Sequence, residues 1–473
     1  MVSRFVERTF IYFVFFILSC FVPFFFIQNK SSFILILIIL SILSVCIILR
    51  LTIAIFHIFL LGMFAFNKSF SYLSLGIGNI PIYVTELILA FFLLKIALFG
   101  IIKKKIKEVK TPLDIPFAVY YSIGLILLFR DLPHYGIEAV RDFVIVYYSL
   151  FFYVITENMV SFEDIQKMVK VCFIGSILSV IFFFIRSSIP QLGNAFGPLL
   201  SKSIYIAYGM HISITILFCI ALRNYLDKRK VFIVAIVSIQ LLAVVLTESR
   251  SVWVSLAISL IFVFIISKEQ RSIILPLGLL IFVVILIWSY STFFNSTLFN
   301  DIYLEGKSIF DSNMQTVSAE TSKWRITTGI AGIHQFLRAP LGSGFGRPAD
   351  MVFLDIVGGS NPSERMLQTD YHNVLLAILV RMGFEGLIVF IWINAVFYYR
   401  CIRFCRNTDE PLYRAYMIGI LACHLSIAIN SMFFQFIQTP YMGIFYWIFM
   451  GLGIALINVT KSTLLNGNKA AIT

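Results

Sequence analysis

Apolar runs of about 17–25 residues recur along almost the whole chain, and they constrain its fold more than any other feature. Each run is long enough to cross a hydrocarbon core of roughly 30 Å as a helix. A chain in which 60% of 473 residues are hydrophobic and 13% are charged could not stay in solution as a water-soluble domain. The short alternating strands of a membrane barrel are not seen in the pattern. We therefore expect an all-α, polytopic integral membrane protein with about 12–14 transmembrane helices, forming one domain over residues 1–473.

The individual spans follow from the positions of these runs. We expect them at about 9–27, 33–49, 51–66, 80–102, 116–129, 142–156, 169–186, 204–222, 231–247, 252–267, 273–290, 372–399, 414–432 and 441–459. Arg50 separates two short runs that one long, kinked helix would also explain, and that alternative would reverse the later assignment of sides. Between two of the spans, Ser161 and Asp164 form a helix start signal, and we expect a small amphipathic helix over Ser161–Lys170 on the inner surface.

The basic residues report the orientation of the chain in the membrane. The net charge of +13 would suggest nucleic acid as a partner for a soluble protein, but here most Lys and Arg residues lie in short loops between apolar runs. Assigning the loops alternately places 22 of the 37 basic residues inside and 13 outside. We therefore expect both termini and the lysine-rich loop at 103–110 to be cytoplasmic, and the long loop at 291–371 to be extracytoplasmic. The first span follows Arg4 and Arg8 and lacks a small-residue cleavage site, so no cleavable signal is expected.

Cysteine and histidine usage gives no sign of a disulfide framework, a metal or a cofactor. Five of the seven cysteines lie in expected spans, two lie on the inner side, and the long outer loop has none. No Cys/His spacing fits a zinc site. We expect neither a metal nor a cofactor.

Arg250 lies in the short outward turn Thr247–Arg250, between two expected spans. One interpretation is an anchor that reaches toward the headgroups, as most arginines at helix ends do. The other is a phosphate contact, because an outward Arg opposes the positive-inside bias and its planar fork can donate two hydrogen bonds to a phosphate.

The long outer loop is not a basic surface, since it holds six basic and eight acidic residues. Any anion site there must come from a few converging arginines. The stretch from Trp324 to Leu337 has helical apolar spacing and predicts a helix lying along the membrane surface. The glycine-rich run Gly342–Arg347 follows it, and without a preceding strand or a following Lys-Ser/Thr it indicates a flexible turn more than a nucleotide loop.

His372 stands where the outer loop re-enters the membrane, in the polar run Asp370-Tyr371-His372-Asn373. A neutral imidazole accepts a proton near neutral pH, so His372 is the best candidate for a general base. A serine-hydrolase interpretation with Asp370 lacks a nucleophile elbow.

Three features together resemble the superfamily of O-antigen ligases and O-antigen polymerases of bacterial envelopes. They are the Ser249-Arg250 turn, the Trp324-Arg325 element followed by APLGSGFG, and the segment HNVLLAILVRMGFEGL that begins at His372. They define a signature region over residues 246–390, whereas the N-terminal half resembles the family only in being a string of spans.

The resemblance implies a metal-independent membrane glycosyltransferase of the C type, acting on the extracytoplasmic face of the bacterial inner membrane. The donor would be an undecaprenyl-diphosphate-linked glycan, and the acceptor a sugar on a lipid-anchored core or a second lipid-linked glycan. At the matching positions, Arg250 and Arg325 would bind the diphosphate and His372 would activate the acceptor hydroxyl. Arg347 and Asn373 adjoin these motifs and are further candidates for substrate binding. Acidic Glu248 directly precedes the Ser249-Arg250 pair and is a departure from the family pattern, because its charge could pair with Arg250 and weaken the role of Arg250.

Two alternatives remain open. The motifs do not separate a lipopolysaccharide O-antigen ligase, which we favour slightly, from an O-antigen or exopolysaccharide polymerase. A secondary transporter is the alternative of another class, but it would concentrate ionisable groups near the bilayer midplane and would not need so long an outer loop. The few such groups here have simpler explanations: Lys95 can extend toward the inner lysines, and Arg381 with Glu385 has the spacing of an i,i+4 pair.

Overall fold

The structure is a computed structural model, and it describes only part of the chain. The described residues are 52–77, 80–102, 111–188, 203–222, 230–246, 249–267, 317–347, 371, 373–434 and 436–470. The chain divides into two compact units, Met1–Phe59 and Leu60–Thr473. The first unit contributes only residues 52–59 to the described part, so the core and the candidate site belong to the second unit.

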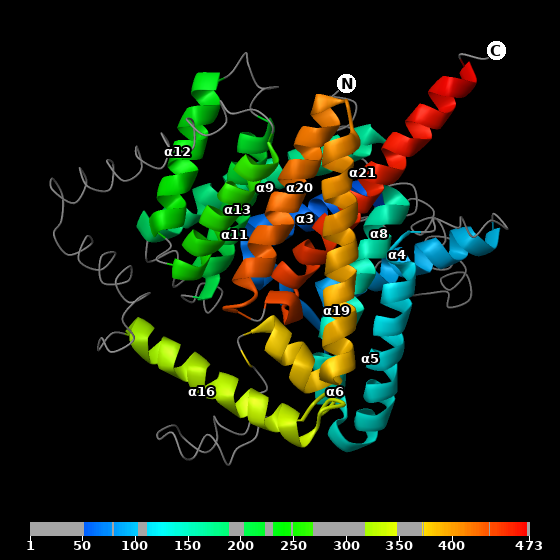
Figure 1. Cartoon of the computed structure of the whole chain (residues 1–473). Coiled ribbons are helices and arrows are strands. Elements are labelled where there is room, and N and C mark those ends of the chain that lie inside the picture. Colours follow the sequence, from blue (N-terminus) through cyan, green and yellow to red (C-terminus); the bar gives the residue numbers. More distant parts are fainter. Residues whose placement is uncertain are drawn as a thin grey trace, which may run out of the picture. The chain divides into compact units, whose positions relative to one another are not determined.

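Helices dominate the described residues (Figure 1). The helices are α3 (Thr52–Ser71), α4 (Val84–Ile102), α5 (Asp114–Tyr135), α6 (Ile137–Asp142), α7 (Val144–Tyr147), η1 (Tyr148–Leu150), α8 (Phe151–Asn158), α9 (Phe162–Ser188), α11 (Ser203–Leu222), α12 (Lys230–Leu246), α13 (Arg250–Ile266), α16 (Val317–Arg338), α19 (Val374–Asn407), α20 (Pro411–Asn430), η6 (Phe436–Gln438) and α21 (Met442–Ala470). A short antiparallel hairpin of β1 (Ser74–Ile77) and β2 (Ile80–Tyr83) pairs Ser74 with Tyr83, and the sequence pattern does not indicate it.

Six helical stretches in the described part are long and apolar enough to cross a membrane: Asp114–Tyr135, Ile137–Asn158, Phe162–Ile185, Val374–Asn407, Pro411–Asn430 and Met442–Ser462. Four shorter apolar helices accompany them, within α3, α11, α12 and α13. The expected all-α, multi-span class is confirmed. The expected spans at 9–27, 33–49 and 273–290 lie outside the described residues, so the total of about 12–14 stays a prediction.

One expected element is wrong in extent. Ser161 and Asp164 do cap a helix, because the Asp164 amide donates to Ser161 Oγ (3.2 Å) and the Ser161 amide donates to the Asp164 carboxylate (3.1 Å). The helix that they start is α9, which continues without a break to Ser188. Ser161–Lys170 is therefore the beginning of a membrane helix and not a separate surface helix.

The core lies where α5, α8, α19, α20 and α21 meet. Trp447 of α21 is fully buried, and its ring contacts the rings of Phe117, Phe390 and Tyr446. Lipid supplies no hydrophobic drive between helices, so small residues that permit close approach matter here. A Cβ atom on Gly451 of α21 would lie 2.7 Å from Ile155 of α8, which shows how closely these two helices pack.

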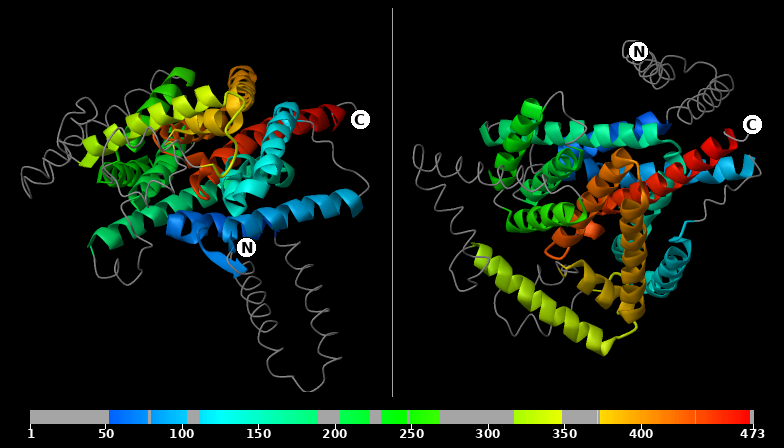
Figure 2. Two further views of the ribbon diagram at one scale, coloured as in Figure 1. Left: turned by 90° about the horizontal axis from the view of Figure 1, so that it is seen from below. Right: turned by 45° about the horizontal axis from the view of Figure 1, so that its top comes forward.

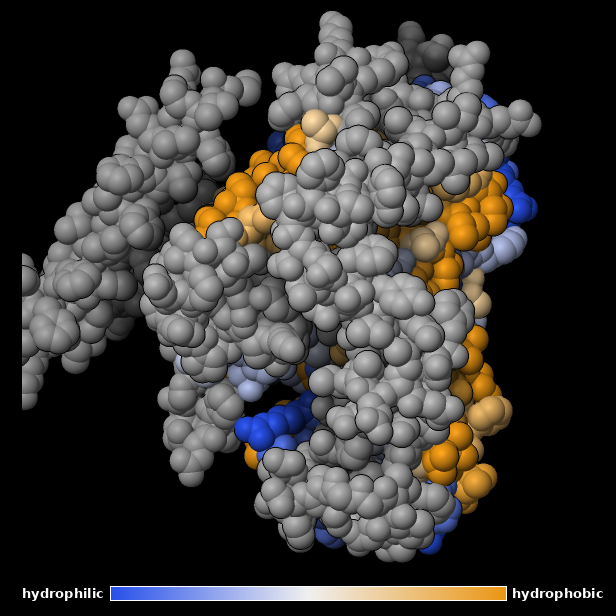
Figure 3. All heavy atoms as spheres, turned by 90° about the vertical axis from the view of Figure 1, so that its left-hand side faces the viewer, coloured by the Kyte–Doolittle hydropathy of each residue, from blue (hydrophilic) through white to orange (hydrophobic). Residues whose placement is uncertain are grey.

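Different segments of the chain form the two ends of this helix array. α5 and α19 lie side by side and run in opposite directions (Figures 1 and 2). The end of α5, α6, α16 and the start of α19 gather at one end, which the sequence predicts to be extracytoplasmic. The start of α5 and the end of α19 lie at the other, predicted to be cytoplasmic. Between them, Figure 3 shows hydrophobic side chains over the described part of one face, and exposed apolar residues such as Ile126, Phe129 and Ile391 suit contact with lipid.

Candidate functional site

A break in α19 organises the end of the helix array at which α6, α16 and the start of α19 gather. Gly383 is the non-helical residue inside α19, with φ 74° and ψ −172°, a conformation that strains any other residue. The amide of Phe384 donates to the carbonyl of Pro340 (3.1 Å) instead of continuing the helix. The carbonyl of Val380 is thereby released, and it accepts from the amide of Ser343 (2.8 Å). Residues 339–347, which we call the glycine loop, thus supply hydrogen bonds that α19 loses at its break.

The loop and the break fit together because both carry glycine. The amide of Gly344 donates to the carbonyl of Arg381 (3.0 Å). A Cβ atom on Gly342, whose φ is 96°, would lie 2.6 Å from that carbonyl oxygen. A Cβ atom on Gly383 would lie 2.5 Å from the carbonyl carbon of Leu341. Larger residues at either position would push the two backbones apart.

A buried ion pair fixes the loop to α6. Arg381 of α19 is 1% exposed, and its Nη1 lies 2.8 Å from Oδ2 of Asp142 at the end of α6. The same guanidinium nitrogen donates to the carbonyl of Arg347 (2.7 Å), and more weakly to that of Gly344 (3.4 Å). Asp142 in turn accepts from the amide of Gly346 (2.7 Å). The expected pairing of Arg381 with Glu385 is therefore wrong, because the break at Gly383 interrupts the helical spacing and Asp142 takes the contact.

A second carboxylate holds the middle of the loop. Asp131, near the end of α5, is buried and accepts from the amide of Phe345 (2.8 Å). Arg130 pairs with the same carboxylate (2.8 Å). Two loop amides thus point at carboxylates, which would repel a phosphate. The run Gly342–Arg347 is neither a phosphate cradle nor the flexible turn that its composition indicated; it is a buried connector between α5, α6 and α19.

The start of α19 is held on both sides of His372. Just before it, the buried hydroxyl of Tyr371 donates to Gln335 of α16 (2.7 Å). Just after it, Asn373 caps α19 by accepting from the amide of Leu376 (3.1 Å), and its side-chain amide donates to the carbonyl of Met432 (3.2 Å). His372 itself lies outside the described residues. Its neighbours on both sides are anchored, so the chain enters and leaves position 372 at fixed points.

The start of α13 lies at the same end of the array. Ser255 of α13 accepts from Asn430 at the end of α20 (3.4 Å), and the next residue, Ser431, accepts from the amide of Val374 (3.0 Å). Arg250 begins α13 and lies five residues before Ser255, which is about 7.5 Å along a helix axis. The backbone of Arg250 therefore lies about 7.5 Å along α13 from the level at which α19 begins.

The structure describes the side chains of only two of the five candidate residues, Arg347 and Asn373. Asn373 is a helix cap, and Arg347 is exposed with its carbonyl bound to Arg381. Arg250 and Arg325 have described backbones, in α13 and α16, but their side chains, like His372, lie outside what the structure describes. Their roles stay predictions. α16 begins at Val317, seven residues before Trp324, and Figures 1 and 2 show it crossing obliquely to α19.

An apolar groove of about 510 Å³ lies between α13, α19, α20 and α21. It is lined by Val254, Ile258, Leu375, Phe390, Ile391, Asn394, Ala395, Tyr398, Leu425, Ala428, Ile429, Met432, Phe433 and Tyr446. Leu375 and Met432 place one end of the groove beside Asn373, and Tyr398 places the other end deeper in the array. Its few polar groups are engaged, since Tyr446 donates to Asn394 and Tyr398 pairs with His424 Nδ1 (2.9 Å).

The fold and its arrangement define a multi-pass membrane protein with a polar end, which holds α6 and the glycine loop, and an apolar groove beside the start of α19. Residues 233–391 match the family model described as O-antigen ligase. No curated protein matches the chain. The chain therefore carries a region similar to the O-antigen ligase domain, which occurs in O-antigen ligases and polymerases, and members of that family transfer glycosyl groups. The resemblance based on the three motifs is confirmed, and the match favours an enzyme over a secondary transporter.

Proposed function

We propose that this protein transfers a glycan from an undecaprenyl-diphosphate carrier to a sugar acceptor on the extracytoplasmic face of the bacterial inner membrane. A lipopolysaccharide O-antigen ligase is the favoured form, and an O-antigen or exopolysaccharide polymerase is the alternative. The observation that carries the proposal is the family match over residues 233–391, a range that contains Arg250, Arg325 and His372.

The apolar groove supports a lipid-linked donor. A polyprenyl chain is a long hydrocarbon, and a groove with almost wholly apolar lining suits it. The end of the groove at Leu375 is two residues from Asn373, so a chain in the groove would bring its diphosphate to the level where α13 and α19 begin. We assign the neutralisation of the diphosphate to Arg250 and Arg325, each by a two-pronged contact.

The chemistry needs one proton transfer and one leaving group. His372 takes the proton of the acceptor hydroxyl, and the resulting oxygen nucleophile attacks the anomeric carbon of the donor sugar. The bond between that carbon and the phosphate oxygen breaks, and undecaprenyl diphosphate leaves with its new charge stabilised by Arg250 and Arg325. Arginine can supply this stabilisation without a metal, so we propose that transfer is metal-independent.

Analysis of lipid-linked glycans in cells lacking the gene distinguishes the two forms. Full-length chains left on the carrier point to a ligase, and single repeat units without chains point to a polymerase. Normal glycan, with neither species accumulating, would contradict the proposed function.

Filling the groove tests the donor's position. Ala428→Trp should block the groove and lower glycan transfer by purified protein at least tenfold, because the polyprenyl chain and the indole compete for one space. Ile388→Trp is the matched control: Ile388 is an exposed residue of α19 that does not line the groove. Equal activities for the two variants, at equal protein levels, would exclude the groove as the donor site.

A further inference from the structure

Basic side chains from two helices border adjoining hollows at the end of α19 opposite the glycine loop. The hollows have volumes of about 290 and 390 Å³ and share Arg400, Ile457 and Lys461. The first is also lined by Thr111, Pro112, Ile454 and Asn458, and the second by Arg403, Phe404, Asn407, Thr408 and Thr460.

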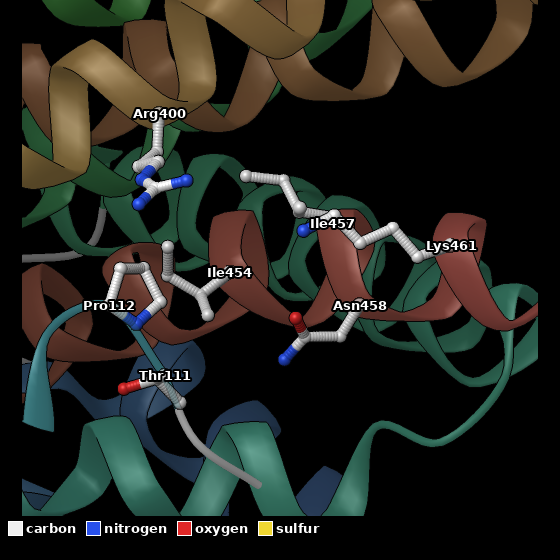
Figure 4. Close-up of a pocket in the computed structure, with 7 residues that line it drawn as sticks. All are labelled: Thr111, Pro112, Arg400, Ile454, Ile457, Asn458 and Lys461. Carbon is white, nitrogen blue, oxygen red and sulfur yellow. The ribbon is translucent and has the colours of Figure 1, made fainter.

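Two cations converge on the first hollow. Figure 4 shows the Arg400 side chain from α19 and the Lys461 side chain from α21 turned toward the space between their helices. Arg403 lies three residues beyond Arg400 and therefore on the same face of α19, where it borders the second hollow. All three residues are exposed, so an ion from outside can reach them.

No carboxylate in the described part of the chain forms an ion pair with these three residues. Neither hollow has Asp or Glu in its lining, and the ion pairs among the described residues do not involve Arg400, Arg403 or Lys461. The nearby Asp114 is engaged: it accepts from the amide of Thr111 (2.7 Å). Like charges that share a hollow repel one another, and an anion between them would turn the repulsion into attraction.

We propose that these hollows bind the phosphate of an anionic phospholipid, with its acyl chains against the apolar side of the same site. Arg400 can grip phosphate oxygens with its planar fork, while Lys461 adds a point charge. Ile454, Ile457 and Phe404 give the site an apolar floor that a free phosphate would not need.

The location supports a lipid as the source of the phosphate. The lysine-rich stretch at 103–110 immediately precedes Thr111, so the sequence places this end of the protein at the cytoplasmic leaflet. Anionic lipids give that leaflet a negative surface, and basic pockets between membrane helices are known to hold their headgroups. A lipid bound here would bridge α19 and α21, far from the extracytoplasmic end, and the inference does not rest on the proposed function.

The test is a lipid titration of the purified full-length protein in detergent. Phosphatidylglycerol should bind saturably, seen by native mass spectrometry, and should raise the unfolding temperature, whereas phosphatidylcholine should do neither. The double variant Arg400→Gln/Lys461→Gln should lower the affinity for phosphatidylglycerol about tenfold or more. Arg406→Gln is the matched control, because Arg406 is an exposed residue of α19 with the same charge that lines neither hollow.

Three outcomes would overturn the inference. They are wild-type affinity in the double variant, an equal loss in Arg406→Gln, and equal binding of the two lipids. Inorganic phosphate is titrated in parallel: if it protects the protein and phosphatidylglycerol adds nothing, the site binds free phosphate and not a lipid. The single variants Arg400→Gln and Lys461→Gln, each expected to lose part of the affinity, give the same comparison if the double variant does not fold.

Discussion

The ion pair between Arg381 and Asp142 should be a main support of the end of the helix array that holds the glycine loop. Asp142→Asn keeps the size of the side chain and an oxygen that can still accept from Gly346, but removes the charge opposite Arg381. Arginine cannot lose its proton in a protein, so the variant leaves a cation that is 1% exposed and removes the charge of the carboxylate that lies 2.8 Å from it. Breaking a buried pair in this way costs about 3–5 kcal/mol, and since the Asp142 side chain is 16% exposed we expect about 3 kcal/mol.

The lost stability of Asp142→Asn should appear as local opening of the glycine loop. A cost of about 3 kcal/mol corresponds to roughly a hundredfold faster exchange of the protected loop amides, measured by hydrogen–deuterium exchange of peptides that cover residues 341–347. Glu138→Gln is the matched control on the same helix. Glu138 pairs with Arg141 on the surface, where the side chains are 53% and 47% exposed, and such pairs contribute about 0–1 kcal/mol.

A double-mutant cycle identifies the pair as the cause. Arg381→Gln removes the cation and leaves Asp142 partly hydrated, and the double variant Arg381→Gln/Asp142→Asn leaves neither charge of the pair. The double variant should therefore cost about 1–2 kcal/mol less than the sum of the single variants. Additive costs, or unchanged exchange in Asp142→Asn, would refute the reasoning.

The remaining predictions concern the proposed chemistry and orientation. His372→Gln should lower turnover by roughly 10²- to 10⁴-fold while carrier binding survives, measured with purified protein and lipid-linked donor over pH 5.5–8.5; wild-type turnover across that range would exclude His372 as the base. Arg250→Lys should be nearly as inactive as Arg250→Ala in the same assay, because Lys keeps the charge but loses the planar fork. The same substitutions at Arg325 should have the same effect. A fully active Lys variant would exclude the substituted arginine from the diphosphate site. A cysteine at position 311 should react with an impermeant reagent from the extracytoplasmic side, and labelling only after the inner face is opened would reverse the topology.

The positions of the membrane-spanning helices are predictable because the length of each apolar run indicates them. The stretches expected at 116–129, 414–432 and 441–459 largely coincide with observed helices, α5, α20 and α21 respectively. The ends are less predictable, since a helix does not stop where the hydrocarbon does. The sequence predicts an end at 399 for the span that forms α19, but this helix continues through polar residues to Asn407. α9 likewise begins in the stretch expected to form a separate surface helix, where no glycine or proline interrupts it.

The contacts around the glycine loop could not be predicted from local patterns. Arg381 and Asp142 are far apart in the sequence, and the helical spacing of Glu385 suggested a nearer partner. Gly383 removes that partner by breaking the helix, an effect that depends on the backbone of the glycine loop. A signal was nevertheless present. A charged residue inside an apolar span rarely lacks a buried partner, and Asp131 near the end of α5 and Asp142 at the end of α6 were available as partners for Arg381.

The charges of this end also limit where a diphosphate can bind. Asp131 and Asp142 face the glycine loop, and Arg130 and Arg381 pair with them, so these four groups balance one another and leave no surplus positive charge for a substrate. The loop amides and these four charged groups are thus engaged with one another, although the loop is glycine-rich and lies in the matched domain. Positive charge for a substrate has to come from other arginines, and Arg250, Arg325 and the exposed Arg347 are the candidates. The network's part is to hold the glycine loop against α5, α6 and the break in α19.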